Sequence, residues 1–595
     1  MAENSNQENL LRAAAQAWIA GDPDPATRAE LQALLDAGSL DDVRARLEPP
    51  LAFGTAGLRG AVGAGSARMN RAVVIRTTRG VADFLGSRRS GARSLPVVVG
   101  HDARSTSATF AGDVVAVLGA AKIPVRYFTE PVPTPLVAYA ARFLAATAAI
   151  VVTASHNPRE DNGYKLYLDD GVQLNAPLDL AIEDAIRRVG PAASVPRLAF
   201  DATGPHAAAA SGVEPLDTTE WLERYITEIL GHLGPRPRTA LRIAYTPLHG
   251  VGYRFAKRAL ERAGYHDVRV VPEQAEPDGG FPTTPFPNPE EPGTLDLGLA
   301  FAKAEAADLL IANDPDADRL SVAVPTVSGT FRRLTGNQVA ALLADACIPE
   351  RSGAPAAGQP ALSPGSTLGP ALVLASVVTT PLVEAIARSR GARFERTLTG
   401  FKWLWTAALS LERAGSGRFA YACEEALGYS LTPAVRDKDG LSAAIAIADL
   451  AARCRERGES LLDRLHALGR RFGVWASAPA SIKVEGRPVA DAVSGVLDRA
   501  ATSPPERLAS RRVLAVCDYR VGADRRTPWL PQTPLVELEL EGGRVLLRPS
   551  GTEPKLKCYV DLRAEVAAGA AVGPVDDALA AEACAVAAAL VAWLG

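Results

Sequence analysis

The segment AIVVTASHNPREDNGYKLY places a serine directly after an apolar stretch. Ala149–Val152 predict a strand, and Asn157–Pro158 favour a turn, so Ser155 should lie on a loop at the strand end. Such strand ends form the ligand clefts of α/β sheets. Ser155 could act there as a nucleophile or phosphate carrier, with His156 or Lys165 as a charged partner. Taken alone, the segment is also typical of an Asn-Pro turn with a capping serine.

The segment LLIANDPDADRL places three carboxylates two residues apart after another apolar stretch. On a loop, Asp314, Asp316 and Asp318 can converge on one hard cation, and Mg²⁺ prefers carboxylate oxygens. An EF-hand is excluded because positions 6 and 12 of the loop hold Arg319 and Pro325 instead of Gly and Glu. A solvated acidic turn is the alternative. Repulsion among three carboxylates, with only Arg319 adjacent, favours the metal site.

The segment GRVLLRPSGTEPKLKCYV predicts a strand that ends in a loop suited to a phosphate group. Its backbone N–H groups, hydroxyls and guanidinium fork could hold phosphate oxygens. An ordinary hairpin turn is the alternative. The residues concerned are Arg548, Ser550, Gly551 and Thr552.

Three further segments are weaker signals. FGTAGLRG is a glycine-rich loop that ends near Arg59, RTLTGFKWLW places Lys402 after a glycine turn, and YACEEALGYS places Glu424 and Glu425 on a loop. An exposed pair of glutamates is also typical of solvated surface. Together, the six segments supply what phosphoryl transfer to a polyol requires, where positioning and charge neutralisation provide most of the catalysis. No Walker P-loop or kinase motif set is present, so ATP is not the obvious phosphate donor.

Alternating strand and helix patterns surround these segments and predict the elements that position them. Residues 8–48 predict short amphipathic helices. Three cycles of strand and helix follow, at 95–188, 240–319 and 369–400, and predict three related α/β units. Residues 474–594 predict an α+β domain with a largely antiparallel sheet and a C-terminal alanine-rich helix. Residues 349–369 and 189–216 are interpreted as surface loops.

Composition narrows the class of protein. The 595 residues allow roughly three to six domains. The net charge of −3 gives no electrostatic drive toward nucleic acid. The six cysteines include no CxxC pair, which fits a reducing compartment without structural zinc. The N-terminus lacks the pattern of a signal peptide, and no run of about 18 apolar residues predicts a membrane span. We therefore expect a cytoplasmic, multidomain protein.

The segments resemble, in chain order, those of the α-D-phosphohexomutase superfamily. TASHNP with NGYK, DPDADR, CEEALG and RPSGTEP carry the resemblance, which runs from about residue 50 to about residue 565. FGTAGLRG and TLTGFKW resemble the phosphoglucomutase-2-like branch, which includes phosphopentomutases. The resemblance implies four domains around a central cleft: three related α/β domains and a C-terminal α+β domain of the TATA-box-binding-protein type. The expected boundaries are 1–48 for an N-terminal helical extension, 49–235 for domain I with the phosphoserine loop, 236–332 for domain II with the metal loop, 333–465 for domain III with the sugar-binding loop, and 466–595 for domain IV with the phosphate-binding loop.

The resemblance also implies roles for individual residues. Ser155 would be the phosphoserine and would share Mg²⁺ with the three aspartates. Lys165 and Lys402 would be the general acid/base candidates. The full implied set is Ser155, His156, Lys165, Arg59 and Lys402 at the reacting centre; Ser155, Asp314, Asp316 and Asp318 at the metal; and Arg319, Glu424, Glu425, Arg548, Ser550, Gly551 and Thr552 at the substrate.

The reaction implied is the interconversion of a sugar 1-phosphate and a sugar 6-phosphate through a phosphoserine and a sugar bisphosphate, with glucose as the first candidate sugar. Mg²⁺ would be the cofactor and a bisphosphate of the glucose 1,6-bisphosphate type the activator. The substrate would be a small phosphosugar, with no nucleic acid or membrane partner, and the enzyme a monomer or homodimer. Ala426 stands where many glucose-preferring members have Ser. Phosphopentomutase, phosphomannomutase and glucose 1,6-bisphosphate synthase activities therefore remain alternatives, and a non-catalytic phosphosugar-binding protein is the alternative from another class.

Overall fold

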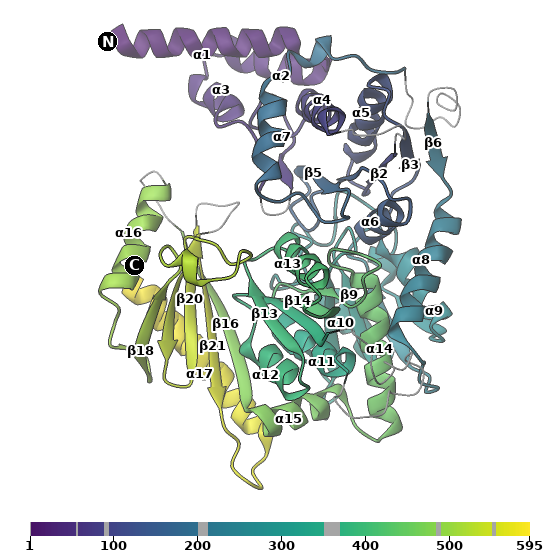
Figure 1. The fold of residues 1–595 in the computed structure, drawn as a ribbon, viewed down its shortest axis with the longest axis vertical. Helices are drawn as coiled ribbons and strands as arrows, with labels where there is room; N and C mark the ends of the chain where they lie inside the picture. The colour runs from purple at the N-terminus through teal and green to yellow at the C-terminus, as the bar shows by residue number, and fades with distance from the viewer. Residues whose placement is uncertain are drawn as a thin grey trace. The chain divides into compact units, whose positions relative to one another are not determined.

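The computed structural model describes residues 2–54, 57–88, 95–199, 212–349, 369–483, 489–549 and 555–594 (Figure 1). The chain divides into two compact units, each built from separate stretches of sequence. The first comprises Met1–His232, Arg242–Phe331 and Pro433–Ile445. The second comprises Leu233–Leu241, Arg332–Thr432 and Ala446–Gly595.

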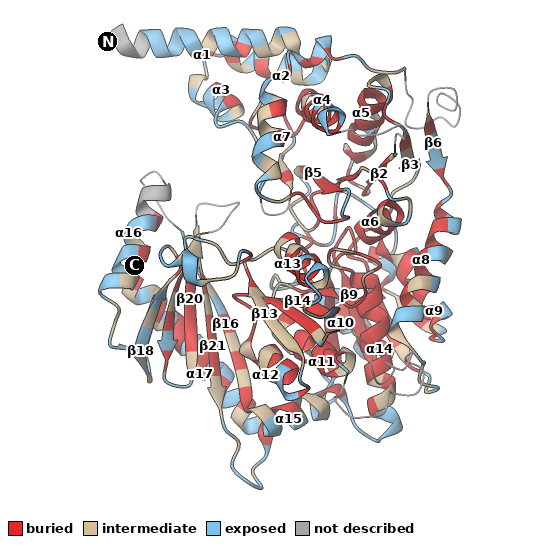
Figure 2. Cartoon of the chain, in the orientation of Figure 1, coloured by how far each residue is buried: buried red, intermediate tan, exposed pale blue. Residues whose placement is uncertain are grey.

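The first unit begins with the predicted helices. They are α1 (Ala2–Gly21), α2 (Pro25–Asp36) and α3 (Leu40–Leu47). The Asp24 side chain accepts a hydrogen bond from the Ala26 N–H, and Pro25 occupies the first helical position, so both residues favour the start of α2. Leu11, Leu31 and Val43 form a small core between the three helices. The outer face of α1 is exposed (Figure 2).

The first sheet has the strand order β1-β5-β4-β2-β3-β6. Strands β4, β2, β3 and β6 are parallel, and β5 returns antiparallel beside β4. Strands β2 and β4 are buried along their whole length, which explains their unbroken apolar sequences. The strands are β1 (Leu58–Ala61), β2 (Val97–His101), β3 (Val125–Phe128), β4 (Ala148–Val152), β5 (Asp161–Leu168) and β6 (Val213–Leu216), with helices α4 (Arg71–Ser87), α5 (Ser107–Ala120), α6 (Thr134–Phe143), α7 (Leu178–Arg187) and α8 (Thr218–Leu233).

The prediction of a surface loop over 189–216 is partly wrong. Residues 192–194 form a short 3₁₀ turn, and β6 pairs in parallel with β3 at the edge of the sheet. Only the two end residues of β6 are buried, so its four residues carry too short a pattern to stand out in the sequence. Residues 200–211 lie outside the described part of the chain.

The second sheet, also in the first unit, has the order β11-β10-β9-β7-β8. Strands β9, β7 and β8 are parallel, and β10 is antiparallel to β9. The elements are β7 (Arg242–Thr246), α9 (Gly252–Arg262), β8 (Asp267–Val270), α10 (Asp296–Ala304), β9 (Leu309–Asn313), β10 (Leu320–Pro325) and β11 (Phe331–Arg333).

The third sheet belongs to the second unit and has the order β13-β12-β14-β15. Strands β13, β12 and β14 are parallel, and β15 is antiparallel to β14. The elements are α11 (Gly336–Cys347), β12 (Ala371–Ser376), α12 (Pro381–Ser389), β13 (Arg393–Thr397), α13 (Phe401–Arg413), β14 (Arg418–Glu424), β15 (Gly428–Ser430) and α14 (Gly440–Glu456). Most of the predicted loop 349–369 lies outside the described residues.

The first three sheets share one plan, as the repeated sequence cycles predict. Each places its third parallel strand beside its first, and then turns back into an antiparallel partner: β4 into β5, β9 into β10, and β14 into β15. The turn of each hairpin therefore leaves the carboxyl end of a parallel strand, where α/β sheets present functional groups. These turns are residues 153–160, 314–319 and 425–427, and each carries one of the predicted site segments.

The fourth sheet, in the second unit, has the order β16-β21-β20-β19-β18-β17. Every pairing that the structure gives between its strands is antiparallel, which confirms an α+β domain after three α/β domains. Helix α16 and strands β17 and β18 were not predicted from the sequence. The elements are α15 (Leu461–Phe472), β16 (Val474–Lys483), α16 (Val489–Thr502), β17 (Arg507–Leu508), β18 (Arg511–Asp518), β19 (Val536–Leu540), β20 (Gly543–Pro549), β21 (Lys555–Ala564) and α17 (Val572–Leu594).

Helix α17 is the one helix in the described part of the chain whose length and apolar composition would suffice to cross a membrane. Leu579, Val586 and Leu590 join the core formed with the fourth sheet. These buried residues recur at helical spacing, so the apolar composition of α17 is explained in part by packing against β16 and β21.

Replacing Trp405 by alanine should destabilise the second unit. Trp405 is fully buried on α13, and its ring stacks on Phe419 with 4.1 Å between ring centroids. Truncating a buried aromatic residue of this size costs about 3–5 kcal/mol. We expect a clearly lower thermal unfolding midpoint for Trp405→Ala. Val327→Ala is the control, because the Val327 side chain is fully exposed and its truncation should leave the midpoint unchanged.

Candidate active site

Ser155 lies in the β4–β5 turn, as predicted, with its side chain buried. Its hydroxyl donates a hydrogen bond to Asp314 Oδ2 at 2.7 Å, and its Oγ lies 3.1 Å from His156 Nδ1. Ser155 has a φ of 53°, in the left-handed region that non-glycine residues rarely adopt. Such a conformation costs about 1–3 kcal/mol and persists only where its surroundings enforce it. The fold therefore holds the hydroxyl in one direction, against the acidic loop.

The three aspartates converge in the β9–β10 turn. One carboxylate oxygen from each lies within 4.8 Å of the others, and all three side chains are fully buried. Oδ1 of Asp316 and Oδ1 of Asp318 have no hydrogen-bond partner among the described residues. Buried anionic oxygens without partners are costly, and a hard cation is the partner that suits this donor set. The residues present fit a metal ion.

Two lysines neutralise part of this charge. Lys165 Nζ donates to Oδ2 of Asp316 and of Asp318, each at 2.6 Å, and Lys438 Nζ lies 3.2 Å from Asp318 Oδ2. Burial by itself would raise the pKa of Asp318, but the charges of Lys165 and Lys438 outweigh it and lower that pKa. For Asp316, burial and the adjacent Asp318 carboxylate raise the pKa. Lys165 reaches these carboxylates because β5 pairs it opposite Val151, beside the Ser155 turn.

Arg59 and Arg319 add positive charge around Ser155. Arg59, on β1, donates to Asn157 Oδ1 at 3.2 Å, and its strand position is opposite Gly163. A side chain at Gly163 would lie 2.5 Å from the Thr153 carbonyl oxygen and 3.0 Å from Arg59 Cγ, so glycine is required there. The Arg319 N–H donates to Asp314 Oδ1 at 2.9 Å.

These guanidinium groups change the state of His156. Burial, followed by the positive charges of Arg319 and Arg59, lowers the pKa of His156 well below its usual value. Burial also lowers the pKa of Arg59, which nevertheless remains charged near neutrality. His156 is therefore a neutral imidazole beside the Ser155 hydroxyl.

The predicted sugar-binding residues lie in the second unit. Glu424 ends β14 and accepts a hydrogen bond from the Gly400 N–H at 2.6 Å, two residues before Lys402 on α13. Glu425 Oε2 accepts from the Ser376 hydroxyl at 3.1 Å. The structure thus brings Glu424 next to the Gly400 turn that begins α13. Lys402, like Glu424, is buried instead of lying free on the surface.

Arg548 ends β20, also in the second unit. Its Nη2 donates to the Tyr559 hydroxyl at 3.0 Å, and its guanidinium carbon lies 5.6 Å from the centre of that ring. Burial would lower the pKa of Arg548, but Tyr559 and the charge of Glu425 raise it. The remaining residues predicted in this loop, Ser550, Gly551 and Thr552, lie outside the described residues.

Sequence reasoning missed two residues that contact the acidic loop. Lys438 bonds Asp318 as described above, and Thr134 donates its hydroxyl to Asp316 Oδ2 at 2.6 Å and its N–H to the Asp316 carbonyl at 3.0 Å. The alternating charges of VRDKDG, after the β14–β15 hairpin, are a sequence pattern that could have identified Lys438. Thr134 begins α6 in a PTP sequence that carries no chemical signal of its own.

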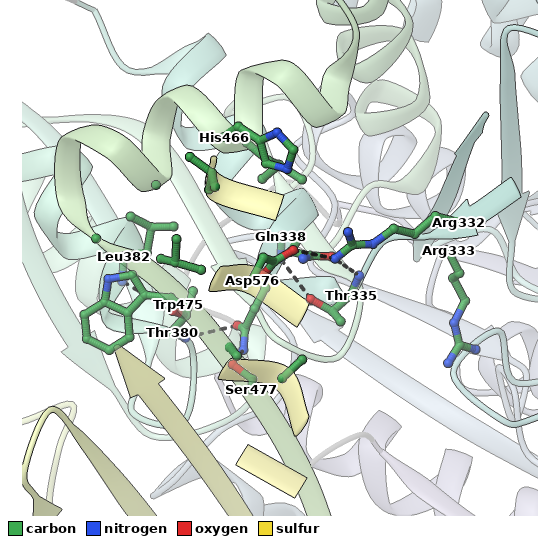
Figure 3. Close-up of a pocket in the computed structure, with 18 residues that line it drawn as sticks. Arg332, Arg333, Thr335, Gln338, Thr380, Leu382, His466, Trp475, Ser477 and Asp576 are labelled. Carbon is green, nitrogen blue, oxygen red and sulfur yellow. Dashed lines mark hydrogen bonds and ion pairs between the residues drawn. The ribbon is translucent and has the colours of Figure 1, made fainter. Parts of the chain in front are cut away.

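A separate cavity of about 140 Å³ lies in the second unit and contains none of the predicted site residues (Figure 3). Arg332 pairs there with Asp576 at 2.7 Å, and Asn337 donates to Ser477 at 2.8 Å. Much of its polar lining is thus engaged within the protein. The cavity is lined by residues of α11, β16 and α17.

The chain matches four family models in succession. They describe phosphoglucomutase/phosphomannomutase α/β/α domain I at residues 50–192, domain II at 223–329, domain III at 335–472, and the C-terminal domain at 509–573. Among solved structures, a phosphoglucomutase/phosphomannomutase family protein from Burkholderia thailandensis has a TM-score of 0.61 at 20% identity, covering 90% of this chain and 96% of that chain. At this level of identity, the similarity supports a shared fold alone.

Curated relatives cover most of the chain. A "probable phosphomannomutase" of Haemophilus influenzae is 35% identical over 83% of this chain and 93% of its own length. A phosphoribomutase of Saccharomyces cerevisiae is 35% identical over 91% of each chain. A glucose 1,6-bisphosphate synthase of Mus musculus is 32% identical over 94% of each chain. The matches to four domain models and the relatives that cover most of the chain agree with a site in which a buried hydroxyl lies against three carboxylates. The chain therefore belongs to the phosphoglucomutase/phosphomannomutase family and is a phosphomutase, an isomerase that moves a phosphoryl group.

Proposed function

We propose that the protein is a phosphosugar mutase in which Ser155 carries the transferred phosphoryl group. The observation that carries the proposal is the Ser155 hydroxyl, fixed at 2.7 Å from Asp314 and 3.1 Å from His156. A strained, buried hydroxyl among carboxylates and cations is suited to a covalent carrier. A simple turn serine needs none of these features.

The proposed reaction has two phosphoryl transfers. In the first, the bond between phosphorus and Ser155 Oγ breaks as a bond forms between phosphorus and a free hydroxyl oxygen of the sugar monophosphate. Lys402 is the candidate base that would accept the hydroxyl proton. The product is a sugar bisphosphate. After it reorients, the bond between its other phosphorus and the sugar oxygen breaks as a bond forms between that phosphorus and Ser155 Oγ. The proton held by the base goes to the sugar oxygen that is released.

The charged residues of the first unit would stabilise the transfer. Asp314, Asp316 and Asp318 would hold Mg²⁺, which when bound would supply positive charge to the phosphoryl oxygens. Lys165 is held by two carboxylates, so it suits a fixed cation beside the phosphoryl group better than a base. Arg59 and Arg319 would bind phosphoryl oxygens with their guanidinium groups.

The sugar would be recognised by residues of the second unit. Glu424 and Glu425 would accept hydrogen bonds from sugar hydroxyls, and Arg548 with Ser550, Gly551 and Thr552 would hold the non-reacting phosphate. We propose glucose 1-phosphate and glucose 6-phosphate as the first substrate pair. Pentose phosphates are the second candidate, because Ala426 offers no hydroxyl to the sugar and the yeast relative is named phosphoribomutase.

A substrate panel tests this proposal. We expect measurable isomerisation of at least one of the 1-phosphates of glucose, mannose, ribose and deoxyribose in coupled assays, activated by the matching bisphosphate. If bisphosphate synthesis from glucose 1-phosphate and an acyl phosphate far exceeded isomerisation of every sugar, the synthase alternative would replace the mutase. If every sugar phosphate were bound but none turned over, a non-catalytic binding protein would replace both.

Ala426→Ser should shift the preference toward hexose. A new hydroxyl beside the glutamate pair can contribute about one hydrogen bond, so kcat/KM for glucose 1-phosphate relative to ribose 1-phosphate should rise by roughly 5–10-fold. Ala426→Cys is the matched control, because its side chain has a similar size and donates only weakly. An equal shift in both variants would attribute the effect to volume and contradict a hydroxyl contact.

A further inference from the structure

Arg104 follows β2, and its guanidinium donates hydrogen bonds to backbone carbonyls from Ser155 to Asp161. We propose that Arg104 is a positioning residue that holds the Ser155 turn in the one backbone conformation from which Ser155 can give and take phosphate. The proposal rests on the function proposed for Ser155 and adds a residue that none of the predicted roles includes.

One guanidinium holds four carbonyl oxygens of the turn. Arg104 Nη2 donates to the carbonyls of Ser155 at 2.7 Å and of Asn157 at 2.6 Å. Nη1 donates to the carbonyls of Pro158 at 2.6 Å and of Asp161 at 2.9 Å. A planar fork of N–H groups can satisfy four acceptors at once, whereas a lysine ammonium offers three donors from a single point. One side chain therefore hydrogen-bonds the backbone of the turn from Ser155 to the start of β5.

The same arginine is linked to the amide side of Ser155 through Asp102. Arg104 Nε lies 3.3 Å from Asp102 Oδ2, and this oxygen also accepts the Thr153 hydroxyl at 2.7 Å. The Thr153 oxygen in turn accepts the Ser155 N–H at 2.9 Å. Both backbone polar groups of Ser155 are therefore fixed, the carbonyl by Arg104 directly and the N–H through Asp102 and Thr153.

Arg104 is itself held in place by a loop after β8. A side chain at Gly279 would lie 2.5 Å from Arg104 Cα, so the loop backbone packs directly on the arginine. The Phe281 ring lies 5.1 Å from the guanidinium carbon. The Arg104 side chain is only 2% exposed, so it cannot turn toward a substrate. Its role must act through the backbone of the turn.

This arrangement explains how a φ of 53° persists at Ser155. Residues in sparsely populated conformations are retained only when the surroundings over-determine them. Without the arginine fork, the turn could relax and move Ser155 Oγ away from Asp314. Misplacement of a reacting atom by about 1 Å costs on the order of 100-fold in rate.

The test compares Arg104→Lys with Arg390→Lys. Arg390 is also a buried arginine, in the other unit, where it donates to the Ile348 carbonyl and to Asp345. Both substitutions should lower the thermal unfolding midpoint. Only Arg104→Lys should lower kcat, by on the order of 100-fold, with KM little changed. The same variant should also be phosphorylated on Ser155 more slowly by glucose 1,6-bisphosphate. Intact mass spectrometry measures this phosphorylation.

Thr153→Val provides a second arm that does not disturb the arginine. It removes the hydroxyl between Asp102 and the Ser155 N–H, and with it two hydrogen bonds of the network. It should lower kcat in the same pattern, by at least about tenfold. If folded Arg104→Lys or Thr153→Val phosphorylated Ser155 at the wild-type rate, the inference would be wrong. If wild-type Ser155 took no phosphate at all, the proposed function would fail instead.

Discussion

Replacing Ser155 by alanine should lower turnover of every sugar phosphate by at least about 10⁴-fold, the scale of losing a covalent catalytic group. The hydroxyl is the only group that the proposed reaction uses to carry phosphate between the two transfers. The alanine variant keeps the backbone contacts of the turn, including the hydrogen bond from Arg104 to the carbonyl of residue 155. Coupled isomerase assays measure the loss. The variant should still bind sugar monophosphate in calorimetry.

Ser321→Ala is the matched control for this prediction. Ser321 is a buried serine on β10, and its hydroxyl has no hydrogen-bond partner among the described residues. Removing this hydroxyl should leave turnover near the wild-type level. Equal activity of the two variants would show that Ser155 is no more than a turn residue.

Replacing Asp316 by asparagine should abolish metal binding and lower turnover by about 10³-fold, since the stabilisation supplied by a catalytic metal amounts to several kcal/mol. The substitution removes one of the three carboxylates that converge within 4.8 Å. It deprives Thr134 of its charged partner and Lys165 of one of its two carboxylate partners. Binding of Mn²⁺, followed by electron paramagnetic resonance as a probe for Mg²⁺, reports the site independently of activity.

Asp113→Asn controls for the loss of any buried carboxylate. Asp113 is a buried residue of α5 and pairs with Arg71 at 2.8 Å, in the same unit as the aspartate cluster. Its substitution should reduce stability and leave Mn²⁺ affinity unchanged. Retained Mn²⁺ affinity in Asp316→Asn would contradict the assignment of the cluster as a metal site.

The sequence allowed the prediction that candidate site residues close together along the chain lie at the ends of strands. Ser155 and the Asp314–Asp318 cluster each follow an apolar strand directly, so the local pattern alone places them at strand ends. The three α/β cycles were predictable for the same reason, because buried parallel strands are nearly continuous apolar runs. Strand β6 was missed because it is short and only half buried.

Residues that act across long sequence separations could not be predicted in this way. Arg104 bonds carbonyls more than fifty positions away, and Thr134 reaches Asp316 across 182 positions. Lys438 follows the β14–β15 hairpin in sequence but forms an ion pair with Asp318 of the β9–β10 hairpin. Contacts between such distant residues depend on how the strands are ordered in the sheets and how the sheets pack. Local sequence patterns predict single strands and helices, but they do not predict that order.

The most direct test of the phosphoserine account is intact mass spectrometry of the wild-type protein before and after substrate. Treatment with glucose 1,6-bisphosphate should add one phosphate, and peptide mapping should locate it on Ser155. Addition of excess sugar monophosphate should then remove it at a rate no slower than turnover. A protein that isomerises sugar phosphates while Ser155 never carries phosphate would contradict the account.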